Sequence, residues 1–158
     1  SAGSGEGSAL MKTPELAADI MAAVVKASAL PVSVKFRLGW DKGSINCVEF
    51  AKAMEQAGVA AVAVHGRTKI QMYAGQDNWD WIREVKKAVS IPVIANGDIV
   101  GGESAVKCLK RTGADGIMIE VHNDPATALC DGPQSLTPDQ FAKVMAKVKK
   151  IREAMTCD

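Results

Sequence analysis

The alternation of short apolar runs with helical patterns constrains the fold of this chain most strongly. The runs are rich in β-branched or small residues, and they start about every 25 to 30 residues, the size of one strand–helix unit. They cover residues 31–38, 59–66, 91–98 and 115–122. Helical patterns occupy residues 13–28, 44–58, 77–89, 102–113 and 137–155. This alternating order predicts an α/β fold with a parallel sheet covered by helices.

The two faces of the expected strands differ in polarity. Val34 and Phe36 share one face of the first strand, whereas Lys35 and Arg37 share the other. A doubly wound sheet is apolar on both faces, but polar groups at the carboxyl ends of the strands are typical of a TIM barrel. A complete barrel has eight strands and about 250 residues. The chain has 158 residues, which predicts half of a TIM barrel: four parallel strands with five helices.

Composition narrows the remaining possibilities. We expect one domain over residues 1–158, with a flexible Gly/Ser-rich lead-in at 1–12. A net charge of +1 gives no bulk attraction for a polyanion, and no apolar run is long enough to span a membrane. The four cysteines show no zinc or C-x-x-C spacing, which favours reduced thiols and a cytoplasmic location. The open edges of a half-barrel predict a homodimer.

Polar residues gather at or just past the expected strand ends. They are Lys35, Arg37, His65, Arg67, Asn96, Gly97, Asp98 and Glu120. Carboxyl ends of parallel strands meet at one rim, so these residues form a candidate ligand site. Each also has a structural interpretation: a strand-end lysine that reaches solvent, a satisfied buried histidine, or a turn at 96–98.

Several motifs resemble those of bacterial tRNA-dihydrouridine synthases. They are "VSVKFRLGWD", "VHGRTKIQMYAGQDNWDWIREVK", "IPVIANGDI" and "LKRTGADGIMI", and the resemblance runs from about residue 5 to 119. It implies a TIM-barrel flavoprotein oxidoreductase that binds FMN and uses NADPH to reduce uridine in tRNA. By resemblance, the FMN contacts are Lys35, His65, Arg67, Asn96, Gly97 and Asp98.

The chain also departs from that family. The motif of the family's acid cysteine and its C-terminal tRNA-binding domain are absent from the sequence, so no catalytic residue is assigned. Where the family has a Gly-Arg pair for the FMN phosphate, this chain has Glu120 and Val121. A carboxylate at that position repels a phosphate.

The C-terminal segment, residues 120–158, resembles a different barrel enzyme, DAHP synthase. The pattern "EVHNDPATALCDGPQSL" matches the end of that family's last strand and the following loop. By this resemblance, Glu120 and Asp131 are ligands of a divalent metal ion. The chain then is a chimera of a dihydrouridine-synthase-like half-barrel, residues 13–119, and this segment.

Three functional interpretations follow. The first is an FMN-binding fragment of a tRNA-dihydrouridine synthase that is incomplete for catalysis. The second is a divalent-metal-binding, DAHP-synthase-like fragment. The third is a structural half-barrel without activity.

Overall fold

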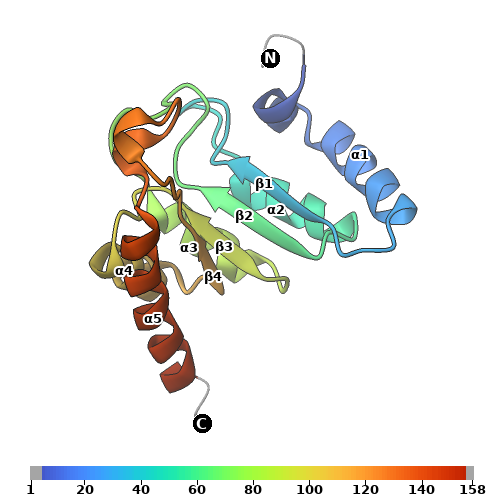
Figure 1. The fold of residues 1–158 in the computed structure, drawn as a ribbon. Helices are drawn as coiled ribbons and strands as arrows, with labels where there is room; N and C mark the ends of the chain where they lie inside the picture. The colour runs from blue at the N-terminus through green and yellow to red at the C-terminus, as the bar shows by residue number, and fades with distance from the viewer. Residues whose placement is uncertain (1–4, 156–158) are drawn as a thin grey trace.

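Four parallel strands form the centre of the molecule in the computed structural model, which describes residues 5–155 (Figure 1). They are β1 (Ser33–Arg37), β2 (Ala61–His65), β3 (Val93–Asn96) and β4 (Gly116–Met118). The strands pair in the order β1-β2-β3-β4, and every neighbouring pair is parallel. The order in the sheet thus follows the order in the chain, as in a (βα)-barrel. The predicted half-barrel is confirmed.

The residues that the structure describes also form five α-helices and three short 3₁₀ helices. They are η2 (Gly7–Lys12), α1 (Pro14–Ala27), α2 (Cys47–Gln56), α3 (Trp79–Ala88), α4 (Gly102–Thr112), η3 (Pro125–Thr127), η4 (Gly132–Gln134) and α5 (Pro138–Met155). Helices α2, α3 and α4 cover one face of the sheet, and the opposite face of β1 and β2 lies open toward the viewer in Figure 1. No helix of the part described is long and apolar enough to cross a membrane.

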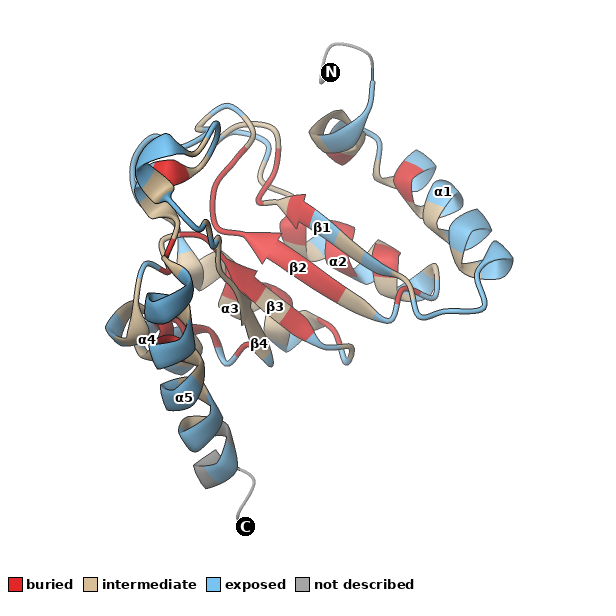
Figure 2. Ribbon diagram, in the orientation of Figure 1, coloured by how far each residue is buried: buried red, intermediate tan, exposed pale blue. Residues whose placement is uncertain are grey.

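The apolar face of the sheet builds the core. Phe36, Val62 and Val64 are buried, and the ring of Phe36 lies 5.0 Å from that of Phe50 on α2, centre to centre. Figure 2 shows this buried layer running through β2 and β3. Because successive side chains of a strand point to opposite faces, the polar residues of β1 are left on the open face. The predicted division between an apolar and a polar face is therefore confirmed.

The predicted flexible lead-in at residues 1–12 is wrong for residues 7–12. These residues form η2, and Met11 is only 3% exposed within the core. The side-chain amide of Asn46 also donates a hydrogen bond of 2.7 Å to the Met11 carbonyl. An apolar anchor and a backbone partner thus fix this segment; residues 1–4 lie outside the described part.

Strand β4 is shorter than the predicted run at 115–122. Its last pairing joins Met118 to Asn96, where β3 ends. Beyond this point the chain pairs with Leu136, whose N–H donates to the Glu120 carbonyl at 2.9 Å and whose carbonyl accepts from His122 N–H at 2.9 Å. Glu120 therefore lies past the strand and not within it.

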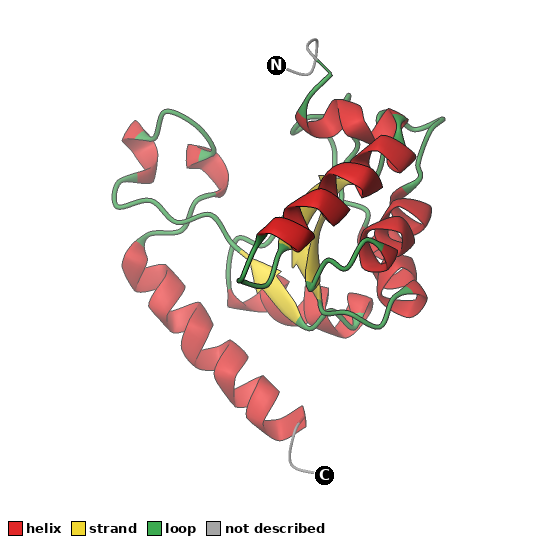
Figure 3. Ribbon diagram, turned by 90° about the vertical axis from the view of Figure 1, so that its right-hand side faces the viewer, coloured by secondary structure: helices red, strands yellow, loops and turns green. Residues whose placement is uncertain are grey.

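Helix α5 runs beside α4 and diverges from the sheet (Figure 3). Among the side chains of α5 that the structure describes, Val144 is buried, and Phe141 and Val148 on the same stripe pack partly against the core. The spacing of three and four residues places these side chains on one face of the helix. This face of α5 is thus the surface that attaches the C-terminal segment.

Candidate functional site

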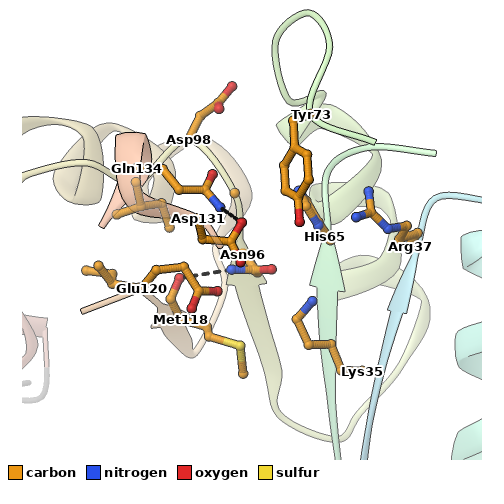
Figure 4. A pocket seen from close by; sticks show the side chains of 13 residues that line it. Lys35, Arg37, His65, Tyr73, Asn96, Asp98, Met118, Glu120, Asp131 and Gln134 are labelled. Carbon is orange, nitrogen blue, oxygen red and sulfur yellow. Dashed lines mark hydrogen bonds between the residues drawn. The ribbon is translucent and has the colours of Figure 1, made fainter. Parts of the chain in front are cut away.

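A polar pocket opens at the carboxyl ends of the four strands (Figure 4). Its volume is about 90 Å³, well below the roughly 300–1,000 Å³ of a typical ligand pocket. It is lined by Lys35, Arg37, His65, Tyr73, Asn96, Gly97, Asp98, Ile99, Met118, Ile119, Glu120, Asp131 and Gln134. The described residues therefore form a wall with a shallow recess and not a closed chamber.

Charge is divided across this pocket. In Figure 4, the cations Lys35 and Arg37 from β1 lie on one side, and the carboxylates Glu120 and Asp131 lie on the other. His65 and Asn96 lie between the two groups. The predicted strand-end position is confirmed for Arg37, the last residue of β1, but not for Lys35, which lies in the middle of that strand. The sequence also did not show that both acids would face these cations.

Lys35 is exposed on the open face of the sheet. The pocket walls still remove enough water to lower the pKa of its amine, and the nearby Arg37 cation adds to this effect. Glu120 and Asp131 act in the opposite direction and raise it. No ion pair is formed by this amine within the described residues, so it is available to a ligand.

Arg37 supports the rim of the site. Its Nη1 donates hydrogen bonds to the carbonyls of Thr68 at 3.3 Å and Met72 at 3.1 Å. These carbonyls belong to the loop after β2. The guanidinium thus fixes the loop that carries Tyr73 over the pocket.

His65 ends β2 and is 6% exposed. Burial lowers the pKa of its imidazole to about 3, and the cations of Arg37 and Lys35 contribute to the shift. The imidazole is therefore neutral at pH 7. A neutral ring offers one donor and one acceptor nitrogen to its surroundings.

Asn96 ends β3, and its side-chain nitrogen donates to the Met118 carbonyl on β4 at 3.2 Å. This bond closes the floor between two strands and leaves Oδ1 as the side-chain atom for a ligand. The next residue, Gly97, has φ +105°, a conformation that side chains disfavour. Its carbonyl accepts a hydrogen bond of 3.2 Å from the indole N–H of Trp79. The indole of Trp79 thus helps to hold this turn.

Arg67 lies beneath the pocket and not on its wall. It is 5% exposed, and its Nη2 donates to Asp98 Oδ1 at 2.9 Å and to the Gly75 carbonyl. Its Nη1 lies 2.9 Å from Asp77 Oδ2. The guanidinium of Arg67 thus binds groups of the protein itself. Asp98 is one of these partners, although its side chain is 36% exposed at the edge of the pocket.

Asp77 is the residue that sequence reasoning missed. Its side chain is 0% exposed, and burial together with Asp98 raises the pKa of the carboxyl to about 7, against the effect of Arg67. The sequence pattern placed it in a helix start and gave it no role. The glycines at 66 and 97 signal a close approach to the backbone, but not which side chain makes it.

The two proposed metal ligands share one wall of the pocket. Asp131 Oδ1 accepts a hydrogen bond of 2.7 Å from Gln134, and its carboxylate raises the pKa of Tyr73. The described residues contain no group of three or more His, Cys, Asp or Glu side chains that could hold a metal ion. The site thus offers two carboxylates, and the metal role of Glu120 stays a prediction.

The described cysteines divide into two kinds. Cys47 and Cys108 are fully buried, and burial raises the pKa of each thiol to about 12. Cys130 is exposed. None of them forms a disulfide, and Cys157 lies outside the described part.

The fold and the polar rim define a protein of the (βα)-barrel class with a candidate ligand site at the carboxyl ends of its strands. The chain matches the family model "Dihydrouridine synthase (Dus)" over residues 1–157 and belongs to that family. The predicted resemblance is thereby confirmed, and the match includes the segment after residue 119.

Curated relatives agree with this assignment. The chain is 53% identical over 114 residues to "Probable tRNA-dihydrouridine synthase 1" of Synechocystis, covering 72% of this chain and 32% of the relative. It is 55% identical over 113 residues to "Probable tRNA-dihydrouridine synthase" of Rickettsia prowazekii, covering 72% and 35%. It is 52% identical over 113 residues to "tRNA-dihydrouridine synthase B" of Vibrio vulnificus, covering 72% of this chain and 35% of the relative. The chain spans about a third of the length of these relatives.

Solved structures confirm the barrel architecture. The DAHP synthase of Thermotoga maritima superposes with a TM-score of 0.65 and 19% identity, covering 94% of this chain and 44% of the other. A mandelate oxidase gives a TM-score of 0.51 and 16% identity, covering 82% and 48%. At these identities the likeness shows the fold alone. The predicted DAHP-synthase resemblance is thus found at the level of the fold.

Proposed function

We propose that the chain supplies one wall of the FMN site of a tRNA-dihydrouridine synthase, an oxidoreductase that reduces uridine in tRNA with NADPH. The observation that carries this proposal is the convergence of Lys35, His65 and Asn96. They come from three consecutive strands of a family member, and all of them line one pocket. A tRNA substrate implies a cytoplasmic location.

The chemistry of these side chains fits the ring end of a flavin. Flavin carbonyl oxygens and ring nitrogens accept hydrogen bonds, which an exposed ammonium can donate, and the acceptor nitrogen of a neutral imidazole can accept one from a ring N–H. Lys35 would hold the ring through its free amine, and Asn96 would offer Oδ1 to a ring N–H. Gly97, which lines the same pocket, lets backbone approach closely. When bound, the flavin supplies the hydride chemistry.

The phosphate end fits poorly. Glu120 lines the pocket where the family carries its Gly-Arg pair, and Asp131 lies on the same side. Two carboxylates repel a phosphate dianion. We therefore propose that the chain recognises the flavin ring and gains little from the phosphate.

Titration of the purified chain with FMN, followed by quenching of flavin fluorescence, tests the proposal. We expect micromolar binding that weakens about tenfold in Lys35→Ala, a loss of about 1.4 kcal/mol. Lys52→Ala, an exposed lysine on α2, is the matched control and should bind as the wild type does. Absence of binding at millimolar FMN contradicts the proposal.

A comparison of riboflavin with FMN tests the role of the acidic end. We expect nearly equal affinities for the two flavins in the wild-type chain. The double substitution Glu120→Gly/Val121→Arg restores the family pair and should favour FMN over riboflavin by tenfold or more, because a charge-assisted bond replaces a repulsion. A strong preference of the wild type for FMN would show that the acids do not face the phosphate.

The second candidate is a divalent-metal site at Glu120 and Asp131. The observation that favours it is that both carboxylates line the same side of the pocket. Hard cations such as Mg²⁺ and Mn²⁺ prefer oxygen ligands. A rise in melting temperature with Mn²⁺ that disappears in Asp131→Ala supports this candidate. An unchanged melting temperature rejects it.

The homodimer is proposed on the same footing. The edges of β1 and β4 are unpaired within the described residues, and α1 exposes an apolar stripe of Leu16, Ile20 and Val24. A ring of eight strands from two copies would join β4 of one copy to β1 of the other, and α1 and α5 would both lie over that junction. Light scattering coupled to gel filtration measures the mass, and a monomer at high concentration rejects the ring.

A further inference from the structure

The side chain of Asp77 is packed between two turns of the site. A Cβ at position 66 would lie 3.0 Å from the Asp77 Cβ, and a Cβ at position 97 would lie 1.8 Å from its Oδ2. Glycine at these two positions therefore makes room for the carboxyl group. Position 66 follows β2, and position 97 follows β3.

Polar contacts join the same segments. Arg67 bridges the two acids, with its Nη1 at 2.9 Å from Asp77 Oδ2 and its Nη2 at 2.9 Å from Asp98 Oδ1. The backbone N–H of Asp77 donates to Asp98 Oδ2 at 2.7 Å. These contacts form a polar network that joins the turn after β2, the turn after β3 and the segment leading to α3. None of these contacts needs a ligand.

The imidazole of His65 faces this polar network. Its Nε2 lies 3.5 Å from Asp77 Oδ1, longer than a hydrogen bond. Both atoms are buried, and neither forms a hydrogen bond within the described residues. A shift of a few tenths of an ångström joins them. Buried polar atoms that face each other in this way are strongly driven to pair.

We propose that Asp77 is a positioning residue that selects the Nε2–H tautomer of His65 and, through Arg67, fixes the turn at 96–98 against it. This inference rests on the proposed function and deepens it, because both segments supply walls of the proposed flavin site. Asp77 does not line the pocket itself. It acts on a ligand only through the groups that it holds.

The charges around the pair support this assignment. The pKa of His65 is lowered to about 3, so its ring is neutral and one nitrogen carries the proton. The pKa of Asp77 is raised to about 7, so at pH 8 the carboxyl is ionised. A carboxylate accepts and cannot donate. At pH 8 the nitrogen that faces it must therefore be the protonated one, and Nδ1 is left as the acceptor.

Nitrogen-15 chemical shifts of the imidazoles at pH 8 test the proposal without any ligand. The chain has two histidines, His65 and His122, and His122→Gln assigns the signals. The wild type should show His65 as a single Nε2–H tautomer. Asp77→Asn, which keeps the shape but offers both a donor and an acceptor, should give a mixture. Asp19→Asn, an exposed carboxylate on α1, is the control and should leave the tautomer unchanged.

FMN affinity is the second measurement on the same variants. Asp77→Asn should weaken binding tenfold or more, and Asp19→Asn should not. If the wild type binds no FMN but its tautomer still depends on Asp77, the proposed function fails and the positioning role stands. An identical His65 tautomer in wild type and Asp77→Asn overturns the positioning role, whatever the affinities. Should Asp77→Asn not fold, a tautomer mixture in the wild type alone overturns it.

Discussion

The substitution Gly97→Ala is the sharpest test of the packing beneath the site. The added Cβ would lie 1.8 Å from Asp77 Oδ2, 2.5 Å from its Cγ and 2.8 Å from its Oδ1. All three atoms belong to one side chain. That side chain is confined because it is fully buried and paired with Arg67. Relief of the clash therefore has to move the carboxyl away from the guanidinium.

The magnitude follows from two contributions. Position 97 has φ +105°, and a side chain in a left-handed conformation costs about 1–2 kcal/mol. Separating one partner from a buried ion pair costs about 3–5 kcal/mol. The sum of about 4–7 kcal/mol is comparable with the whole stability of a domain, about 5–15 kcal/mol. We expect Gly97→Ala to be barely folded at 25 °C.

Urea denaturation followed by circular dichroism measures the loss, with Gly75→Ala as the matched control. Position 75 has φ +71°, and nothing lies within 4 Å of its Cβ position, so only the strain of about 1–2 kcal/mol applies there. In an Asp77→Ala background the clashing atoms are absent, and Gly97→Ala should then cost no more than the control. Equal losses for Gly97→Ala and Gly75→Ala in the wild-type chain would refute the reasoning.

Two further predictions concern the same region. The first concerns stability between about pH 4 and 6.5. In this window the folded chain holds a proton on Asp77 (pKa about 7) that the unfolded chain has released, so Asp77 lowers the stability as pH rises. The folded chain lacks a proton on His65 (pKa about 3) that the unfolded chain holds, so His65 raises the stability as pH rises. In the wild type the two slopes cancel. Asp77→Asn keeps only the slope of His65, so as pH rises through this window it should gain stability relative to wild type by at most about 1.4 kcal/mol per pH unit. Urea midpoints at several pH values measure this gain, and parallel curves of stability against pH for the two proteins would contradict the pKa shifts. The second concerns Trp79→Phe, which removes the hydrogen bond to the Gly97 carbonyl. It should cost about 1 kcal/mol of stability and weaken FMN binding, whereas Trp81→Phe, the control on the same helix, should leave FMN binding unchanged. Equal effects of the two substitutions on FMN binding argue against a role of the indole N–H.

The position of each candidate side chain along the chain was readable from the sequence. Lys35, His65 and Asn96 lie within apolar runs of the right length for strands, and parallel strands bring their carboxyl ends to one rim. The structure places all three on one pocket. The environment of each was not readable from the sequence. Lys35 lies on the open face of the edge strand β1 and is exposed, whereas His65 at the end of β2 faces the buried Asp77 and is itself buried.

The roles of the charged residues were decided by contacts between distant segments. Arg67 and Asp98 are 31 residues apart in the chain and bind each other; their predicted contact with the cofactor stays a prediction. Asp77 was missed because the space for its side chain is left by two glycines that are distant in the sequence, one eleven residues before it and one twenty after it. A local pattern records the turn that glycine permits, but it does not record which side chain fills the space.

Sequence patterns were enough to predict the class of fold and the rim on which the candidate site lies. Those properties depend on periodicity and on the carboxyl ends of strands, which are local and repeat along the chain. The tertiary structure alone decided which polar residues face the pocket and which lie beneath it. Burial and pairing depend on the distance between segments, and only the closed packing of β2, β3 and the start of α3 sets that distance.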